Sequence, residues 1–284
     1  MLKDCRISGF ADEIDGSLDR QIEVLKELGQ TYIELRSADE INVSDLTVKQ
    51  AESVKEKLKK AGIKVSSLGS PIGKIGIQDD FGKHMELLEH TLELAELFDT
   101  SYIRMFSFYI PEGENPDRYT DEVLRRTEKM IIAAEKKKIT LLHENEKGIY
   151  GDKAVRCRKL MEEFSGKYYK AVFDFANFVQ CGQDTIEAYE MLQPYIEYVH
   201  VKDALSKNGE VVLAGDGDGN VVELLNRLEK TAYDGFLSLE PHLTLFAGFE
   251  KLEKAGADKI RTDKVAAYKA AHGRLQELLN KKEI

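Results

Sequence analysis

The sequence predicts a (β/α)8 barrel, in which eight parallel strands alternate with eight helices. Three observations support this prediction. Short apolar segments recur eight times along the 284 residues, and a longer amphipathic segment follows each of them. No GxGxxG sequence follows the first strand, although a dinucleotide-binding open sheet would place one there. The regular alternation therefore favours a closed barrel over a doubly wound sheet.

The eight expected strands are six to eight residues long and rich in β-branched and aromatic side chains. Both properties favour strand over helix. In chain order the expected strands are 5–10, 31–36, 63–69, 101–108, 139–144, 171–176, 196–203 and 235–240.

The helices are predicted from apolar residues that recur every three or four positions. In the first, residues 17–29, these are Leu18, Ile22, Leu25 and Leu28, and Gly29 predicts the end of the helix. The other expected helices are 48–62, 83–98, 121–138, 154–164, 185–195, 221–230 and 263–280. The connection 241–262 is longer than average, and we expect a short extra helix or cap within it.

Composition limits the class of protein. Lys and Arg number 41 against 51 Asp and Glu, a formal net charge of −10. A surface of this sign repels phosphate backbones, so we expect no nucleic acid partner. Three widely spaced cysteines fit a reducing cytoplasm, and neither a signal peptide nor a membrane span is expected. We expect one cytoplasmic domain over residues 1–284.

Polar residues lie at the carboxyl ends of four consecutive strands, where the active sites of barrels are found. Glu144 and Glu240 end the fifth and eighth expected strands, and Asp174 and His200 lie in the sixth and seventh. Side chains alternate between the two faces of a strand, so Glu240 shares the inward face with Ser238. We therefore expect these four side chains to meet at one end of the barrel.

Three carboxylates and one imidazole in this arrangement indicate a divalent metal site. Without a cation the carboxylates would repel one another. Oxygen ligands with a single imidazole suit a moderately hard ion, so we expect one Mn²⁺, with Mg²⁺, Co²⁺ or Zn²⁺ as alternatives. One such residue alone is as often an unrelated polar strand end, and only the set of four carries the inference.

The same residues lie in the segments HEN (143–145), FDFAN (173–177), HVKD (200–203) and LEPH (239–242). Together with the eight-unit rhythm, these segments resemble the sugar phosphate isomerase/epimerase group of the xylose isomerase-like TIM barrel superfamily. That group includes ketose 3-epimerases, hydroxypyruvate isomerases and inosose dehydratases. The resemblance implies that Glu144, Asp174, His200 and Glu240 bind one divalent metal, and that the two glutamates also form an acid/base pair.

The chemistry of that group accounts for these residue types. A metal bound by a carbonyl and its neighbouring hydroxyl acidifies the C–H between them. One carboxylate removes that proton to give an enediolate, and a second returns a proton. Return with inversion is epimerisation, and return to the adjacent carbon is isomerisation. We assign Glu144 and Glu240 to these roles, and the order in which they act stays open.

Other polar residues are candidates for substrate binding. Epimerases of the group often carry histidine three residues after the strand-six aspartate, where this chain has Asn177, so the substrate can differ from a ketohexose. Lys202 would neutralise charge on the substrate or form a structural ion pair, and Asn145 is expected at the rim. Arg104 and Glu34 either pair with each other inside the barrel or line the substrate pocket.

Three further features have simpler expectations. His143, next to Glu144, should point towards the helices. Residues 215–220, GDGDGN, lack the sixth-position Gly and twelfth-position Glu of a calcium loop, and they predict a tight loop that opens the seventh helix. Residues 69–76, GSPIGKIG, do not match a phosphate-binding loop and are expected to form a mobile loop over the site.

The sequence thus predicts a divalent-metal-dependent sugar or sugar-phosphate isomerase or epimerase. Two alternatives stay open: an inosose dehydratase-like lyase on the same metal site, and a non-catalytic carbohydrate-binding barrel without a stoichiometric metal. Related DNA repair enzymes of the endonuclease-IV type need histidines that the segments SSLGSP and RMFSFY lack. The expected partner is a small sugar, and pairing of barrels into a homo-oligomer is compatible with the fold.

Overall fold

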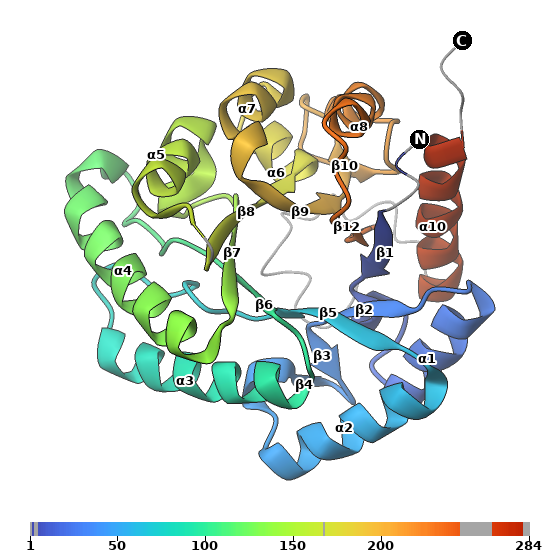
Figure 1. Cartoon of the computed structure of the whole chain (residues 1–284). Coiled ribbons are helices and arrows are strands. Elements are labelled where there is room, and N and C mark those ends of the chain that lie inside the picture. The colour runs from blue at the N-terminus through green and yellow to red at the C-terminus, as the bar shows by residue number, and fades with distance from the viewer. Residues whose placement is uncertain (1, 3–4, 167, 245–262, 281–284) are drawn as a thin grey trace.

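The computed structural model describes residues 2, 5–166, 168–244 and 263–280. Eight parallel strands form one sheet in the order β1-β12-β9-β8-β7-β6-β5-β2. The sheet curls so that β1 and β2, its two ends, lie side by side, and helices surround it on the outside (Figure 1). The prediction of a (β/α)8 barrel is therefore confirmed.

Each predicted strand is present. The strands are β1 (Arg6–Gly9), β2 (Tyr32–Leu35), β5 (Lys64–Gly69), β6 (Tyr102–Met105), β7 (Thr140–Glu144), β8 (Tyr169–Asp174), β9 (Ile196–Val201) and β12 (Phe236–Leu239). Several boundaries differ from expectation by one to three residues, and two of them have a local reason. β6 is shorter than predicted, and Phe108 beyond it has a φ of 67°, outside the extended region. β8 ends at Asp174 because the Asp174 side chain caps a helix that begins at Phe175.

The helices also match the predicted segments. They are α1 (Leu18–Glu27), α2 (Val48–Ala61), α3 (Phe81–Leu97), α4 (Thr120–Lys137), α5 (Ala154–Phe164), α7 (Thr185–Leu192), α8 (Val221–Lys230) and α10 (Lys264–Asn280). Local signals explain their ends: α2 begins with a capping box of Thr47 and Gln50 and stops at Gly62, whose φ is 72°.

The sequence patterns did not predict several short elements. They are α6 (Phe175–Gln180), the hairpin strands β3 (Ser37–Ala38) with β4 (Ile41–Asn42) and β10 (Asp203–Ala204) with β11 (Val211–Val212), and the 3-10 turns η1 (Ala11–Glu13), η2 (Val43–Asp45), η3 (Pro116–Tyr119), η4 (Tyr150–Asp152) and η5 (Gln193–Tyr195). Most of the connection 241–262, where a cap was expected, lies outside the described residues.

The apolar interior has two parts. The main core fills the space between the barrel and its helices. A smaller cluster of Leu142, Val172, Tyr198 and Phe236 lies inside the barrel, with Tyr32 and Tyr102 packed against it. Above it the Tyr198 hydroxyl lies 2.9 Å from the Ser66 hydroxyl. These side chains fill the barrel below the polar strand ends, as layers of side chains do in barrels of this kind.

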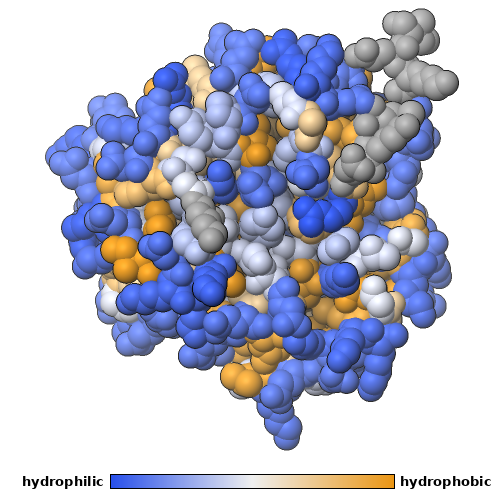
Figure 2. Space-filling model, viewed as in Figure 1, coloured by the Kyte–Doolittle hydropathy of each residue, from blue (hydrophilic) through white to orange (hydrophobic). Residues whose placement is uncertain are grey.

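The outer surface seen along the barrel is mainly polar. Figure 2 shows hydrophilic side chains over most of this face, with apolar residues in separate small patches. Among the described residues, no helix combines the length and the apolar character that crossing a bilayer requires.

The loop after β5 is more firmly held than predicted. Backbone and side-chain hydrogen bonds tie it to neighbouring segments: Ser70 Oγ donates to the carbonyl of Arg104 at 2.6 Å, and the Gly73 N–H donates to His84 Nε2 at 2.7 Å. The Phe106 N–H donates to the carbonyl of Ile72 at 2.8 Å. These contacts do not support the mobile loop expected over residues 69–76.

His143 points away from the barrel axis, as predicted. Its Nε2 lies 2.9 Å from Ser107 Oγ, and it packs against Gly151, where a Cβ would come within 2.5 Å of the imidazole ring. Burial lowers the pKa of His143 to about 4, although the neighbouring Glu144 opposes the shift. Folding therefore favours the neutral imidazole.

This depressed pKa makes stability depend on pH. As the pH falls from about 6.5 to about 4, the unfolded chain binds a proton at His143 before the folded chain does, so the stabilising contribution present above pH 6.5 is lost. The full loss is about 3 kcal/mol. We expect His143→Gln, which cannot titrate, to flatten the fall in unfolding free energy over this pH range in urea titrations.

His84 serves as an internal control, because burial also lowers its pKa to about 4 and it keeps titrating in that variant. The remaining slope should therefore be reduced but not abolished. An unchanged slope in the variant would contradict the assignment to His143.

Candidate metal centre

The barrel brings the four predicted metal ligands together. Glu144 and Asp174 are the last residues of β7 and β8, His200 lies in β9, and Glu240 directly follows β12. One ligand atom from each lies within 4.8 Å of the others, and all four side chains are buried. The sheet register explains the meeting, because Asp174 pairs with His200 and His200 pairs with Ser238 at one level of the barrel.

Two asparagines hold the carboxylate ligands in place. Asn145 bridges β7 and β8: its Nδ2 donates to the carbonyl of Asp174, and its Oδ1 accepts from the Asp174 N–H, both at 3.0 Å. Asn177 Nδ2 donates to Glu144 Oε1 at 3.2 Å and to the carbonyl of Asn145 at 2.9 Å. Both asparagines were predicted to bind substrate, and here their amides contact the ligands and the backbone beside them.

The two nitrogens of His200 face different partners. Nδ1 lies 2.9 Å from Glu144 Oε1 and 3.6 Å from Glu240 Oε2, on the side of the four-residue cluster. Nε2 lies 3.1 Å from Glu34 Oε2, on the opposite side of the ring. Glu34 and Arg104 therefore do not pair with each other: Arg104 donates to Glu144 Oε2 at 2.8 Å, beside the cluster.

Three basic side chains border the cluster. Besides Arg104, Lys202 Nζ lies 3.0 Å from Glu240 Oε2 and 3.3 Å from Asp174 Oδ2. Arg36 lies 3.3 Å from Glu240 Oε1 and forms a two-pronged pair with Asp12 at 2.7 and 3.1 Å. Each cation comes from a different strand end, and each contacts at least one of the proposed ligands.

The carboxylates respond differently to this environment. Burial would raise the pKa of Glu144, but His200 and Arg104 outweigh it and lower the pKa to about 2. Burial raises the pKa of Asp174 to about 7, against the opposing effect of Lys202. Burial would lower the pKa of His200, and Glu144 and Glu34 instead raise it well above its usual value. The cluster thus has to bind protons to offset its negative charge.

A divalent ion fits this centre. Six carboxylates lie in the network: Asp12, Glu13, Glu34, Glu144, Asp174 and Glu240. They face Arg36, Arg104, Lys202 and His242, whose pKa is raised to about 9 mainly by Glu240 and Glu13, against burial and Lys202. If all six carboxylates are ionised, these four groups are positively charged and His200 is neutral, the network carries a net charge of −2. Asp174 Oδ2 is also buried; it has the ion pair with Lys202 at 3.3 Å but accepts no hydrogen bond from the described residues. This oxygen therefore keeps lone pairs that a metal could use.

A neighbouring group has the residue types of a second metal site but a different arrangement. His242 Nε2 lies 3.3 Å from Glu240 Oε1 and 3.5 Å from Glu13 Oε1. Arg36 contacts the same two carboxylate oxygens at 3.3 and 3.4 Å. Because this guanidinium already supplies the positive charge there, the group is better described as a support for Glu240 than as a metal site.

The loop that follows Lys202 is organised by one buried carboxylate. Asp203 accepts hydrogen bonds from the backbone N–H groups of Ala204, Gly215, Gly217 and Gly219 at 2.9 to 3.0 Å. A Cβ at Gly217 would lie 2.4 Å from Asp203 Oδ1, so this segment needs glycine. The GDGDGN segment is thus a tight loop leading into α8, as predicted, and it anchors the residue next to Lys202.

Sequence reasoning missed Arg36 and Glu13. Arg36 directly follows β2, the same position relative to its strand that Glu240 has after β12, so the strand-end rule could have identified it. Glu13 lies in the turn η1 after β1, and nothing in its sequence surroundings separates it from an exposed acidic residue. His242 was not missed: two residues after Glu240, it is expected beside the ligand rather than as one, and its Nε2 lies 3.3 Å from Glu240 Oε1.

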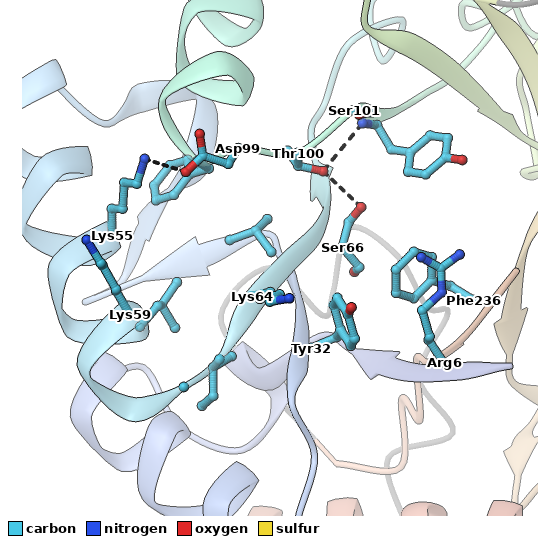
Figure 3. A pocket seen from close by; sticks show the side chains of 16 residues that line it. Arg6, Tyr32, Lys55, Lys59, Lys64, Ser66, Asp99, Thr100, Ser101 and Phe236 are labelled. Carbon is cyan, nitrogen blue, oxygen red and sulfur yellow. Dashed lines mark hydrogen bonds and ion pairs between the residues drawn. The ribbon is translucent and has the colours of Figure 1, made fainter. Parts of the chain in front are cut away.

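A separate cavity of about 580 Å³ lies away from this centre. It opens beside α2, at the amino-terminal starts of the strands, and Arg6, Tyr32, Lys64 and Phe236 are among the residues around it (Figure 3). None of the four proposed metal ligands lines this cavity. Since barrel chemistry takes place at the carboxyl ends of the strands, we do not assign this cavity to the site.

Comparison with known proteins supports the fold and identifies a family. A family model described as xylose isomerase-like TIM barrel matches residues 22–262. A protein named 3-dehydroshikimate dehydratase from Bacillus anthracis is 24% identical over an alignment of 183 residues, and the match covers 58% of this chain and 65% of that protein. The chain therefore spans slightly less than two thirds of this relative's length.

Two solved structures have the same architecture. The IOLI protein with a bound zinc atom superposes with a TM-score of 0.76 at 13% identity, over 96% of this chain and 98% of the other. L-ribulose 3-epimerase superposes with a TM-score of 0.73 at 17% identity, over 99% of each chain. At such identities the similarity establishes a shared fold.

The protonation of the cluster predicts that metal binding releases protons. At pH 7 a pKa of about 7 leaves Asp174 partly protonated, and His200, with its raised pKa, is protonated. Both must lose their protons to bind a metal, so roughly one to two protons should be released per ion. Calorimetric titration of metal-free protein in buffers of different ionisation enthalpy measures this number.

The release should decrease as the pH rises above 7, because Asp174 is then already deprotonated. Metal binding without proton release at pH 7 would contradict the described protonation state.

Proposed function

Because the chain belongs to the xylose isomerase-like TIM barrel family, we propose that it is a divalent-metal-dependent isomerase or epimerase that acts on a sugar or sugar phosphate. The observation that carries the proposal is the buried cluster of Glu144, Asp174, His200 and Glu240 at the carboxyl end of the barrel. The proposed reaction removes a proton next to a carbonyl and returns it on the other face or to the adjacent carbon.

The four residues of the cluster would hold the ion. When bound, it would polarise the substrate carbonyl and stabilise the negative charge of an enediolate. Mn²⁺ is our first choice, because three carboxylates and one imidazole form a predominantly oxygen donor set. Zn²⁺ is the main alternative, and the zinc in the IOLI protein of the same fold supports it.

The chain's own groups would move the proton. We propose Glu144 and Glu240 as the acid/base pair, since each is buried and each contacts a cation that holds its carboxylate in the ionised form. Arg104 and Lys202 would orient the substrate oxygens and stabilise charge developing on them. Asn145 and Asn177 would position the ligands and offer amide contacts to substrate hydroxyls at the rim.

The acid/base assignment predicts that removing one carboxylate lowers turnover but leaves the protein folded. We expect Glu240→Gln to lower the turnover number by at least about 100-fold, because general acid–base catalysis typically contributes 100- to 10,000-fold. Circular dichroism should remain that of the folded barrel. The measurement is a screen of ketoses, their phosphates and inososes in the presence of Mn²⁺.

A matched control is Glu197→Gln in β9. Glu197 accepts a hydrogen bond from the Tyr102 hydroxyl at 2.6 Å and lies outside the cluster. It should retain wild-type turnover. Full activity of Glu240→Gln on the same substrate would refute the role of Glu240.

A dehydratase is the second candidate, and the relative named 3-dehydroshikimate dehydratase favours it. A dehydration can start with the same proton removal and then expel a hydroxide, which needs a proton donor beside the leaving oxygen. Lys202 and His242 are cationic groups in contact with Glu240 and could supply that proton. Other residues of the site would keep the same roles.

The two candidates differ in the fate of water and of the exchanged proton. In D₂O, an isomerase or epimerase should place deuterium on the substrate carbon without a change in its oxygen count. A dehydratase should form a product 18 mass units lighter with a new C=C bond. Mass spectrometry and NMR of reactions with each active substrate make the distinction, and a loss of water in every active reaction would overturn the isomerase proposal.

A further inference from the structure

We propose that Glu34 is a positioning residue for the metal centre: it holds the imidazole of His200 with Nε2–H towards itself, so that Nδ1 is left to bind the metal. This inference rests on the proposed metal-dependent function. Nothing in the sequence patterns distinguished this role, because Glu34 was expected either to pair with Arg104 or to line the substrate pocket.

The geometry separates the two sides of the ring. Nε2 of His200 lies 3.1 and 3.3 Å from the two oxygens of Glu34, and Nδ1 faces Glu144 and Glu240. A neutral imidazole has one N–H donor and one acceptor nitrogen. Both nitrogens face carboxylates, but only those beside Nδ1 belong to the proposed metal ligands. With a metal bound among these ligands, the N–H belongs on Nε2, where Glu34 accepts it, and the lone pair on Nδ1. The lone pair then points into the cluster.

Glu34 itself is fixed rather than mobile. It is fully buried, and Ser238 Oγ donates to its Oε2 at 2.6 Å. The pairing of β2 with β5 shifts register between Ile33 and Glu34, and such irregularities redirect side chains near active sites. Ser238 also pairs with His200 in the ladder between β12 and β9. Ser238 thus connects the carboxylate of Glu34 to β12, the strand that Glu240 directly follows.

Aromatic side chains restrict rotation of the imidazole. The Phe10 ring lies edge-on to it at a centroid distance of 5.2 Å, and the Tyr198 ring at 5.8 Å. With the ring plane held between them, Glu34 is placed to accept the N–H of the nitrogen that faces away from the four-residue cluster. A carboxylate behind a metal-binding histidine orients the ring and increases its basicity, and loss of such a partner typically weakens metal binding 10- to 100-fold.

The competing explanation is a buried pair that only stabilises the barrel. Glu34 has a polar carboxyl group and is removed from water, so it needs a partner in any case. In that explanation, changing Glu34 lowers stability and leaves metal affinity unchanged. In ours, metal affinity falls even when the protein is folded, and the protonation pattern of His200 changes.

The test compares Glu34→Gln with wild type and with Glu197→Gln. The first substitution keeps the shape of the side chain and removes its charge, and the control changes a glutamate three residues before His200 on the same strand. Metal-free proteins are titrated with Zn²⁺ in competition with a chromophoric chelator. We expect the dissociation constant for Zn²⁺ to be 10- to 100-fold larger for Glu34→Gln than for wild type, and unchanged for Glu197→Gln.

A second readout is ¹⁵N NMR of histidine-labelled, Zn²⁺-loaded protein. In wild type we expect His200 Nδ1 to be metal-bound and Nε2 to carry a proton. If Glu34→Gln does not fold, Glu34→Asp, which keeps the charge and shortens the reach, replaces it and should also bind Zn²⁺ more weakly. Wild-type affinity in the folded variant, or metal bound through Nε2, would overturn the inference.

These outcomes are separable from failure of the proposed function. If the wild-type protein binds no metal, the metal-dependent function and the role of Glu34 both fall. If wild type and Glu34→Gln bind Zn²⁺ equally, only the role of Glu34 falls. If Glu34→Gln binds weakly and no isomerase activity is found, the positioning role stands and the reaction has to be reassigned.

Discussion

The arrangement of this barrel mouth follows from one electrostatic constraint: six carboxylates lie around two histidines, His200 and His242, in a region with little access to water. Such groups cannot all remain ionised without compensating charge. Arg36, Arg104 and Lys202 supply part of it from three different strands, and His242 supplies more. The remaining deficit of two charges is the physical reason to expect a divalent ion at this centre.

The polar mouth depends on a rigid frame beneath and around it. Inside the barrel, aromatic and aliphatic residues fill the space below the centre, and the hydroxyls of Ser8 and Ser66 form a polar layer above them. Around the centre, Asn145 forms hydrogen bonds between the ends of β7 and β8, and Asp203 accepts backbone hydrogen bonds from the loop after β9. Apolar packing lower in the barrel thus stabilises the fold, and the carboxyl ends of the strands carry the polar residues of the candidate site.

A centre of this type is compatible with more than one reaction. Epimerisation, isomerisation and dehydration of hydroxy ketones can all begin with loss of a proton next to a carbonyl, and they diverge in where the next proton goes. The proteins that this chain resembles carry names from two of these classes, an epimerase and a dehydratase. The residues that direct the second proton, with Lys202 and His242 as candidates, therefore matter more for the outcome than the fold does.

Local patterns in the amino-acid sequence determined the fold class, the order of strands and helices, and the four donors at the strand ends, because periodicity and strand termination depend on near neighbours in the chain. Only the tertiary structure determined which of these side chains contact one another. Glu34 contacts a histidine 166 residues away, and Arg36 contacts a glutamate 204 residues away. The closure and register of the barrel set these pairings, which no local pattern encodes. For this reason Glu34 and Arg104, which the sequence allowed to pair, instead have different partners, His200 and Glu144.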